Sequence, residues 1–308
     1  MNAYAGSKMV SMQAVQESKH KKRRSEGRSQ WGMIISRFKK NRLAVLGLCI
    51  LGLLLVAVLL APLYANYENA IRQDIPHAFQ KPGTPGHILG TDAYGRDLLT
   101  RMVFGGRISL LAGLSVVLLA LTTGVAVGGI AGYFGGWIDT SVMRVVDIFM
   151  AVPALLLSLA VCTALGEGAR NMVIALMVAD IPRIARITRS SILTLRDQEF
   201  IEAAKCYGTS TFRIIVKHIL PNGIGPVIIT ATLALGSAIL NIASLGFLGV
   251  GINAPTPEWG TILSDNKEYI RYYPYLGMIP GFAIAISVMC VNFVGDGLRD
   301  ALDPKMKK

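Results

Sequence analysis

The chain has 308 residues, of which 52% are hydrophobic and only 16% are charged, and its mean hydropathy is +0.49. Several apolar runs reach the roughly 20 residues that cross a hydrocarbon core of about 30 Å, which excludes an ordinary soluble protein. The net charge of +12 would suit a nucleic-acid-binding protein, but the basic residues gather in particular loops, as topology requires in a membrane protein. We therefore predict an all-α polytopic membrane protein with six transmembrane helices and no nucleic-acid partner.

The N-terminal part of the chain leads from a polar tail into the membrane. Residues 1–30 are polar and basic, and we interpret them as a disordered cytoplasmic tail. Residues 31–64 begin with the amphipathic stretch WGMIISRFKKNR, which predicts an interfacial helix. A first transmembrane helix then runs from Leu43 to Tyr64.

A polar extracytoplasmic segment, residues 65–107, follows the first span. In its second half we expect Thr91 or Asp92 to cap a helix. Asp97 and Arg101 are four residues apart, which predicts an ion pair on one face of that helix.

Residues 108–297 hold the remaining five spans, and residues 298–308 form a basic cytoplasmic tail. Glycines four residues apart in the second span predict a close helix–helix contact. These glycines are Gly124, Gly128 and Gly132. The spans are expected at 108–132, 144–165, from 171 onward, 224–250 and 275–294.

A polar loop, residues 197–222, interrupts the apolar runs and is predicted to form two short helices with a hinge. Gly208 follows the first helix, where a C-terminus favours a residue with positive φ. Pro221 is expected to end the second helix. The apolar stripe of the second helix is predicted from Phe212, Ile215, Val216 and Ile219. Periodicity alone is equally typical of an amphipathic loop on the lipid surface.

Chemical motifs give no indication of an enzyme. The sequence has no G-x-x-x-x-G-K-[ST] phosphate-binding loop and no H-E-x-x-H pair, and its four cysteines lack metal-ligand spacing. We therefore expect no catalytic residue, no metal site and no cofactor in this chain. An intramembrane enzyme would need paired catalytic residues within the spans, where Asp147, Asp180 and some asparagines are the available polar groups.

The distribution of positive charge predicts the topology. Of the 31 lysines and arginines, 23 fall in the segments that this arrangement places inside and 8 in those outside. The excess favours both termini in the cytoplasm, and it places the 197–222 loop on the cytoplasmic side.

Three motifs resemble one family of transporters. Glu-Ala-Ala at 202–204, Gly208 and His-Ile-Leu-Pro-Asn at 218–222 resemble the cytoplasmic loop of ABC importer permeases. NAPTPEWG at 253–260 is similar to the outer loop of the same family. A third pattern resembles the C-type subunit of the dipeptide, oligopeptide and nickel branch. It comprises His87, Gly90, Thr91, Asp92, Gly95, Arg96, Asp97, Arg101, Arg107, Ser109 and Leu110.

The resemblance implies the type I ABC importer permease fold in a bacterial-type cell membrane. It also implies a homologous B-type permease partner, two ABC ATPase subunits that bind ATP and magnesium, and an extracytoplasmic substrate-binding protein. The family uses the 202–222 loop as a coupling element that contacts an ATPase subunit. The residues expected in that contact are Glu202, Ala203, Ala204, Tyr207, Gly208, His218, Pro221 and Asn222.

The expected function is ATP-driven import of peptides or similar solutes by alternating access. The alternatives are a carrier or channel that works without an ATPase, and an importer for nickel, opines or glutathione. A carboxylate at Asp180, near the middle of the fourth span, is expected either to pair with Arg183 or to line the translocation pathway. The residues predicted for that pathway are Asp180, Arg183, Asn241 and Asn292.

Overall fold

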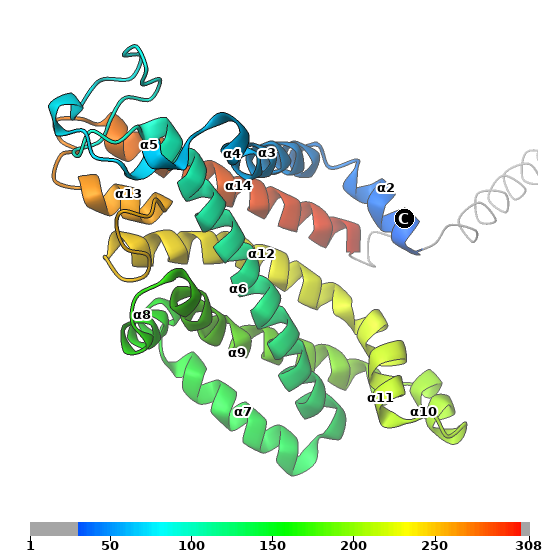
Figure 1. Ribbon diagram of the computed structural model, residues 1–308. Helices are drawn as coiled ribbons and strands as arrows, with labels where there is room; N and C mark the ends of the chain where they lie inside the picture. The colour runs from blue at the N-terminus through cyan, green and yellow to red at the C-terminus, as the bar shows by residue number, and fades with distance from the viewer. Residues whose placement is uncertain (1–29, 303–308) are drawn as a thin grey trace, which may run out of the picture.

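The computed structural model describes residues 30–302, so nearly all of the predicted tail 1–30 and most of the tail 298–308 lie outside the described residues. Within 30–302 the structure is helical, and its strand-like contacts are two isolated bridges. The long helices form one bundle, which α6 crosses from the end that carries α5 and α13 (Figure 1).

The helices of the N-terminal half are α2 Gln30–Phe38, α3 Arg42–Leu59, α4 Ala61–Tyr64, α5 Tyr67–Ile71, the 3-10 turn η1 Ile75–His77, α6 Leu98–Phe134, α7 Gly136–Ala151 and α8 Ala154–Leu165. Those of the C-terminal half are α9 Ala169–Leu195, α10 Glu199–Cys206, α11 Thr211–Arg213, the π-helical turn η2 Ile214–Ile219, α12 Leu220–Phe247, α13 Trp259–Asn266 and α14 Tyr275–Leu302.

Four helical segments are long and apolar enough to cross a membrane: α3, α6, the continuous segment 211–247 and α14. The bent pair α7 and α8 makes a fifth candidate span. The predicted fourth span is α9, which is less apolar because it carries Asp180 and several arginines. It packs against α6, α8 and α12, where Thr188 is buried, whereas Arg183 and Arg186 of the same helix are exposed.

The prediction of one continuous third span, residues 144–165, is wrong. Helix α7 ends at Ala151 and α8 begins at Ala154, and the two are bent by 92°. Pro153 explains the break, because a proline disfavours helical backbone at the residue before it. Val152 accordingly is extended, with φ −95° and ψ 131°.

The prediction that Pro221 ends a helix is also wrong. Pro221 is the second residue of α12, and the chain stays helical through it after the wider π-helical turn η2, an irregularity of the kind found where helices bend. The π-helical turn η2 precedes α12 without a break, so residues 211–247 are one continuous segment.

Helices α6 and α9 cross at close range along the glycines of α6. A Cβ atom added to Gly128 would lie 2.2 Å from the carbonyl oxygen of Ala185. One added to Gly124 would lie 2.8 Å from the Cβ atom of Ile184, and one added to Gly132 would lie 3.0 Å from the carbonyl oxygen of Arg189. Glycine therefore allows the two backbones to approach more closely than any other residue would.

Candidate functional site

The loop between α9 and α12 folds as a compact helical unit at one end of the bundle. We call residues 199–219 the α10–α11 platform. The platform lies at the end of the molecule away from α5 and α13 (Figure 1). The long helix α9 leads into it and the long helix α12 leads out of it. A displacement of the platform would therefore act directly on two helices of the bundle.

Gly208 sets the angle between α10 and α11. Its φ is +72°, a left-handed conformation that favours glycine. The amide of Thr209 donates to the carbonyl of Ala204 at 3.1 Å, and the amide of Gly208 donates to the carbonyl of Lys205 at 2.9 Å. These are the two hydrogen bonds of a Schellman motif, which ends a helix at a residue with positive φ.

The platform is held to the bundle by buried isoleucines, of which Ile219 belongs to the predicted stripe and Ile201 and Ile214 do not. Ile201, Ile214 and Ile219 are buried together with Ile192 of α9. Ile214 and Ile219 are five residues apart, and residues at this spacing share one face of a π-helix. The predicted stripe assumed an α-helical period, and its first member, Phe212, is 76% exposed.

The opposite face of the platform is exposed and partly apolar. Tyr207 is 90% exposed, and Glu202 and Ala203 are also exposed. Ala204 differs, because it is half-buried against the isoleucine cluster. Large apolar side chains that protrude from a helix end are typical of protein interaction sites.

The remaining predicted contact residues lie where η2 passes into α12. The side-chain Nδ2 atom of Asn222 donates to the carbonyl of His218 at 2.6 Å. His218 is half-buried, whereas Pro221 and Asn222 are exposed. This arrangement stabilises the junction between the platform and the long helix.

The predicted pathway residues are not brought together in one cluster. The Nη2 atom of Arg183 donates to the carbonyl of Thr230 on α12 at 3.4 Å, and Arg183 is also the charged neighbour of Asp180, without a direct ion pair between the two side chains. Asp180 and Asn241 are half-buried. Asn292 lies elsewhere, in a groove of about 500 Å³ between α12 and α14.

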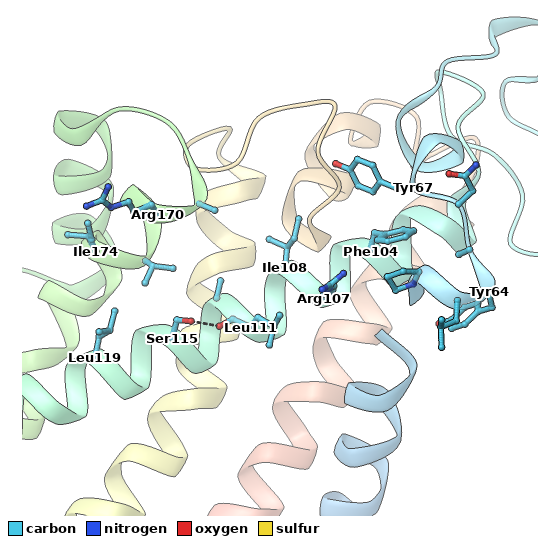
Figure 2. Close-up of a pocket in the computed structure, with 17 residues that line it drawn as sticks. Tyr64, Tyr67, Phe104, Arg107, Ile108, Leu111, Ser115, Leu119, Arg170 and Ile174 are labelled. Atoms are coloured by element: carbon cyan, nitrogen blue, oxygen red, sulfur yellow. Dashed lines mark hydrogen bonds between the residues drawn. The ribbon is translucent and has the colours of Figure 1, made fainter. Parts of the chain in front are cut away.

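A larger groove opens near the other end of the bundle, with a volume of about 1280 Å³ (Figure 2). We call it the Arg107 groove. Its walls are the segment 62–67 after α3, the first part of α6, and the start of α9 at residues 169–174. Arg107 and Arg170 line it together with Tyr64 and Tyr67.

Above this groove the loops form a buried charged cluster that sequence reasoning missed. The side chains of Asp92, Arg96 and Arg101 are fully buried, and Asp265 completes the cluster. Arg96 bonds to Asp92 at 2.6 Å and to Asp265 at 2.8 Å. Two carboxylates and two guanidinium groups balance in charge, which such burial requires.

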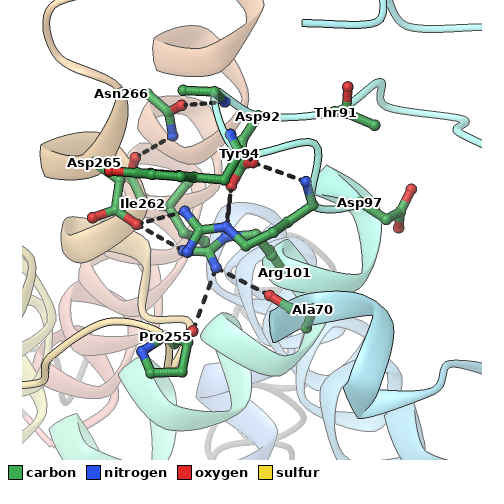
Figure 3. Close-up of polar contacts among 12 residues, drawn as sticks. Ala70, Thr91, Asp92, Tyr94, Asp97, Arg101, Pro255, Ile262, Asp265 and Asn266 are labelled. Atoms are coloured by element: carbon green, nitrogen blue, oxygen red, sulfur yellow. Dashed lines mark hydrogen bonds and ion pairs between the residues drawn. The ribbon is translucent and has the colours of Figure 1, made fainter. Parts of the chain in front are cut away.

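Figure 3 shows Arg101 reaching across three segments of the chain. It donates to Asp265 at 3.1 Å and to the carbonyls of Ala70 at 3.0 Å and Pro255 at 3.4 Å. The predicted Asp97–Arg101 pair is therefore wrong.

Asp97 is the N-cap of α6, a role that was predicted for Thr91 or Asp92. It accepts a hydrogen bond from the amide of Thr100 at 2.8 Å. Its other oxygen lies 2.9 Å from Nδ1 of His87.

Glu258 forms a second buried polar contact at this end of the bundle. Its carboxylate accepts from the hydroxyl of Ser109 at 2.8 Å and from the amide of Thr261 at 2.9 Å. Burial raises the pKa of Glu258, and these hydrogen bonds oppose that shift. The contact joins the start of α13 to α6.

Two family models match the sequence. Residues 124–308 match the family described as "Binding-protein-dependent transport system inner membrane component". Residues 29–82 match "N-terminal TM domain of oligopeptide transport permease C". The α10–α11 platform lies within the first match.

Curated relatives cover nearly the whole chain. The dipeptide transport system permease protein DppC of Alkalihalophilus pseudofirmus is 44% identical over 279 residues, which is 91% of each chain. The oligopeptide transport system permease protein OppC of Bacillus subtilis is 38% identical over 91% of each chain. The glutathione transport system permease protein GsiD of Escherichia coli is 37% identical over 91% of this chain and 92% of its own.

A solved structure has a similar fold. An inward-facing crystal form of the MetNI methionine ABC transporter matches with a TM-score of 0.56 and 22% identity. The match covers 67% of this chain and 98% of the solved one.

Proposed function

The chain belongs to the family of binding-protein-dependent transport system inner membrane components, the permeases of ATP-driven ABC importers, and from this premise we propose that it imports peptides or similar small solutes. The substrate class is supported by relatives whose names specify dipeptides and oligopeptides. A relative named for glutathione, itself a small peptide, is compatible with the same class.

The proposed mechanism rests on the exposed face of the α10–α11 platform. Tyr207 and Phe212 protrude from it, while the isoleucines beneath fix the platform to α9. On our proposal, this face docks on an ABC ATPase subunit. Glu202 and Ala203 would lie in the contact, whereas Ala204 would support it from below.

The complete importer would contain a B-type permease as the second subunit, two ATPases and a substrate-binding protein. Both termini and the platform would face the cytoplasm, and the loops around α5 and α13 would face the binding protein. ATP and magnesium would bind to the ATPase subunits, and this chain would carry no catalytic step.

Movement of the platform would reach the membrane through α9 and α12. Helix α9 has 27 residues and is about 40 Å long, so it extends across the whole bilayer. The Arg183–Thr230 hydrogen bond links α9 to α12 within the bundle. We expect the two helices to move together when the ATPases close and to change the side from which the pathway is accessible.

Reconstitution tests the function. The chain, a second permease and two ATPase subunits are placed in liposomes with the binding protein, and uptake of labelled dipeptide is measured. Uptake is expected with ATP and not with a non-hydrolysable analogue. Uptake that continues without hydrolysis would favour the carrier or channel alternative.

Cross-linking tests the docking face separately. In a Cys206→Ser background, which removes an exposed thiol of the platform, Tyr207→Cys should cross-link to an ATPase subunit. Tyr272→Cys is the matched control, since Tyr272 is 74% exposed in the loop between α13 and α14. Equal cross-linking of both variants to the ATPase would contradict the proposed contact.

A further inference from the structure

The end of α6 packs against the α10–α11 platform. We call residues 132–139, where α6 passes into α7, the α6–α7 turn. Tyr133 of this turn packs against the buried isoleucines that hold the platform, as Leu195 and Ala204 also do. Helix α6 has 37 residues and is about 55 Å long, so it extends beyond a hydrocarbon core of about 30 Å and reaches the level of the platform.

Arg196 adds a polar contact between this turn and the segment that enters the platform. It is the C-cap residue of α9 and directly precedes the loop into α10. Its Nη1 atom donates to the carbonyl oxygen of Gly132 at 3.1 Å. Gly132 is one of the last four residues of α6, whose carbonyl groups have no amide partner within the helix and form the negative end of its dipole. A cationic donor therefore satisfies the carbonyl and stabilises the helix end.

The turn has room for the guanidinium group because of Gly135. Its φ is +66°, and a Cβ atom added to it would lie 2.8 Å from Nη1 of Arg196. Glycine thus provides both the positive φ and the space. The Nε atom of Arg196 donates to the neighbouring Asp197 at 3.3 Å, a pair on an exposed carboxylate that contributes little to stability. The contact with Gly132 is therefore the one that links separate elements.

The turn continues into α7, which is fixed to the same helix. Arg189 of α9 bonds to Asp139 in the first turn of α7, with 2.6 Å between Nη2 and Oδ2. Helix α9 therefore holds both helices that meet at the turn, α7 through Arg189 and α6 through Arg196. A shift of the platform end of α9 would act on both of them.

We propose that Arg196 is a positioning residue that ties the α6–α7 turn to the platform, so that movement of the ATPases reaches α6 and the broken span α7–α8 as well as α9 and α12. This inference rests on the proposed docking of the platform on an ATPase subunit. Packed side chains and hydrogen bonds of this kind can carry coupling between distant sites. Without the Arg196–Gly132 contact, the platform would move while α6 and α7 lag behind it, and fewer peptides would be imported for each ATP hydrolysed.

The ratio of peptide imported to ATP hydrolysed by the reconstituted importer tests this role. Arg196→Met keeps the length of the side chain and removes the guanidinium group, and it should lower the ratio about fivefold, a typical size for coupling between two sites. Arg196→Lys keeps a cationic donor and should restore part of the ratio. Arg299→Met changes an exposed arginine in the last turn of α14 and should leave the ratio unchanged.

Two neighbouring glycines provide a second, matched comparison. Gly135→Ala should lower the ratio, because its methyl group would displace the guanidinium group of Arg196. Gly136→Ala also places alanine at a positive φ, +54°, but nothing lies within 4 Å of the added atom, so its ratio should stay normal. In the Arg196→Met background, Gly135→Ala should not lower the ratio further, since the contact is already lost.

Spin labels test the link in a protein that keeps Arg196. They are attached at Trp137→Cys on α7 and Lys217→Cys on the platform, both at exposed positions. The background is Cys49→Ala/Cys206→Ser, which removes the two exposed thiols. The distance between the labels should be the same without nucleotide and with ATP, because the turn and the platform move as one unit. A distance that changes when ATP binds would overturn the proposal.

Cross-linking separates this inference from the proposed function. If Tyr207→Cys still cross-links to the ATPase in the Arg196→Met importer and the ratio stays at the wild-type value, Arg196 has no positioning role and the inference is overturned while the docking stands. If Tyr207→Cys fails to cross-link when Arg196 is present, the docking itself is wrong, and the inference that rests on it is overturned with it.

Discussion

Arg189 on α9 makes a two-point ion pair with Asp139 on α7, with 2.5 Å between Nε and Oδ1 and 2.6 Å between Nη2 and Oδ2. The contact joins the helix that leads into the α10–α11 platform to the first half of the broken span. A second pair, Arg186–Asp147, joins the same two helices. Spacing along the chain indicates neither contact, because the partners are 50 and 39 residues apart.

Asp139→Asn should weaken the attachment of α7 to α9. The Arg189–Asp139 pair is mostly shielded, with the side chains 31% and 15% exposed, so we expect a loss of about 1–3 kcal/mol. Thermal unfolding of the purified complex measures it, with Arg189→Gln completing a double-mutant cycle. Asp147→Asn is the matched control, because the Arg186–Asp147 pair is about half exposed and should contribute less than about 1 kcal/mol. Equal effects at both aspartates would contradict this ranking.

Gly208→Ala should uncouple the platform from the ATPase without unfolding the bundle. A non-glycine residue at φ +72° costs about 1–2 kcal/mol, and the space around Gly208 is open, so the backbone angle is the sole cause. Gly225→Ala is the control, since Gly225 also has open space but lies within α12. We expect peptide uptake and transport-linked ATPase activity to fall only for Gly208→Ala. Normal uptake by that variant would show that the hinge geometry is dispensable.

Gly128→Ala should disrupt the crossing of α6 and α9. The added methyl group would lie 2.2 Å from the carbonyl oxygen of Ala185, and relieving such overpacking costs about 1–3 kcal/mol. Gly129→Ala adds the same methyl group next to it, but its nearest neighbour there is 3.8 Å away. The yield of assembled complex and its melting temperature should drop for the first variant and not for the second. A similar drop for both variants would mean that the effect does not come from the close contact of Gly128 with α9.

The sequence predicted the features that depend on neighbouring residues. Apolar runs located the spans, and Gly208 was identified from its place after a helical face. The predicted ion pair in the first turn of α6 joined Arg101 to the wrong carboxylate. Arg101 bonds to Asp265, 164 residues away, and not to Asp97. Spacing along a helix cannot indicate that a distant loop competes for the same guanidinium group.

Backbone irregularities were the second source of error. The π-helical turn η2 buries Ile214 and Ile219, five residues apart, and a search for an α-helical period selects Ile219 but takes Phe212 in place of Ile214. Pro153 breaks a span although Pro182 lies buried inside α9 without ending it. The same residue type has opposite results because packing against α6 and α12 holds α9 in place, whereas α7 and α8 have mostly exposed faces.

Asp180→Asn should reduce peptide uptake while the complex still assembles. Asp180 lies about 16 Å along α9 from Ala169, near the middle of the membrane, where an ionised carboxylate needs water or a cationic partner. Among the described residues it makes no direct ion pair, although Arg183 is a charged neighbour. If Asp180 lines the pathway, the amino group of a peptide supplies the missing charge during passage. The asparagine keeps the shape and removes that attraction, so uptake should fall about tenfold, equivalent to about 1.4 kcal/mol in transition-state stabilisation.

Asp180→Glu, which keeps the charge, should restore part of the uptake. Peptides with an acetylated amino terminus should be taken up less well than free peptides by the wild type and equally well by Asp180→Asn. Unchanged uptake in Asp180→Asn, with normal assembly and ATPase activity, would remove Asp180 from the pathway.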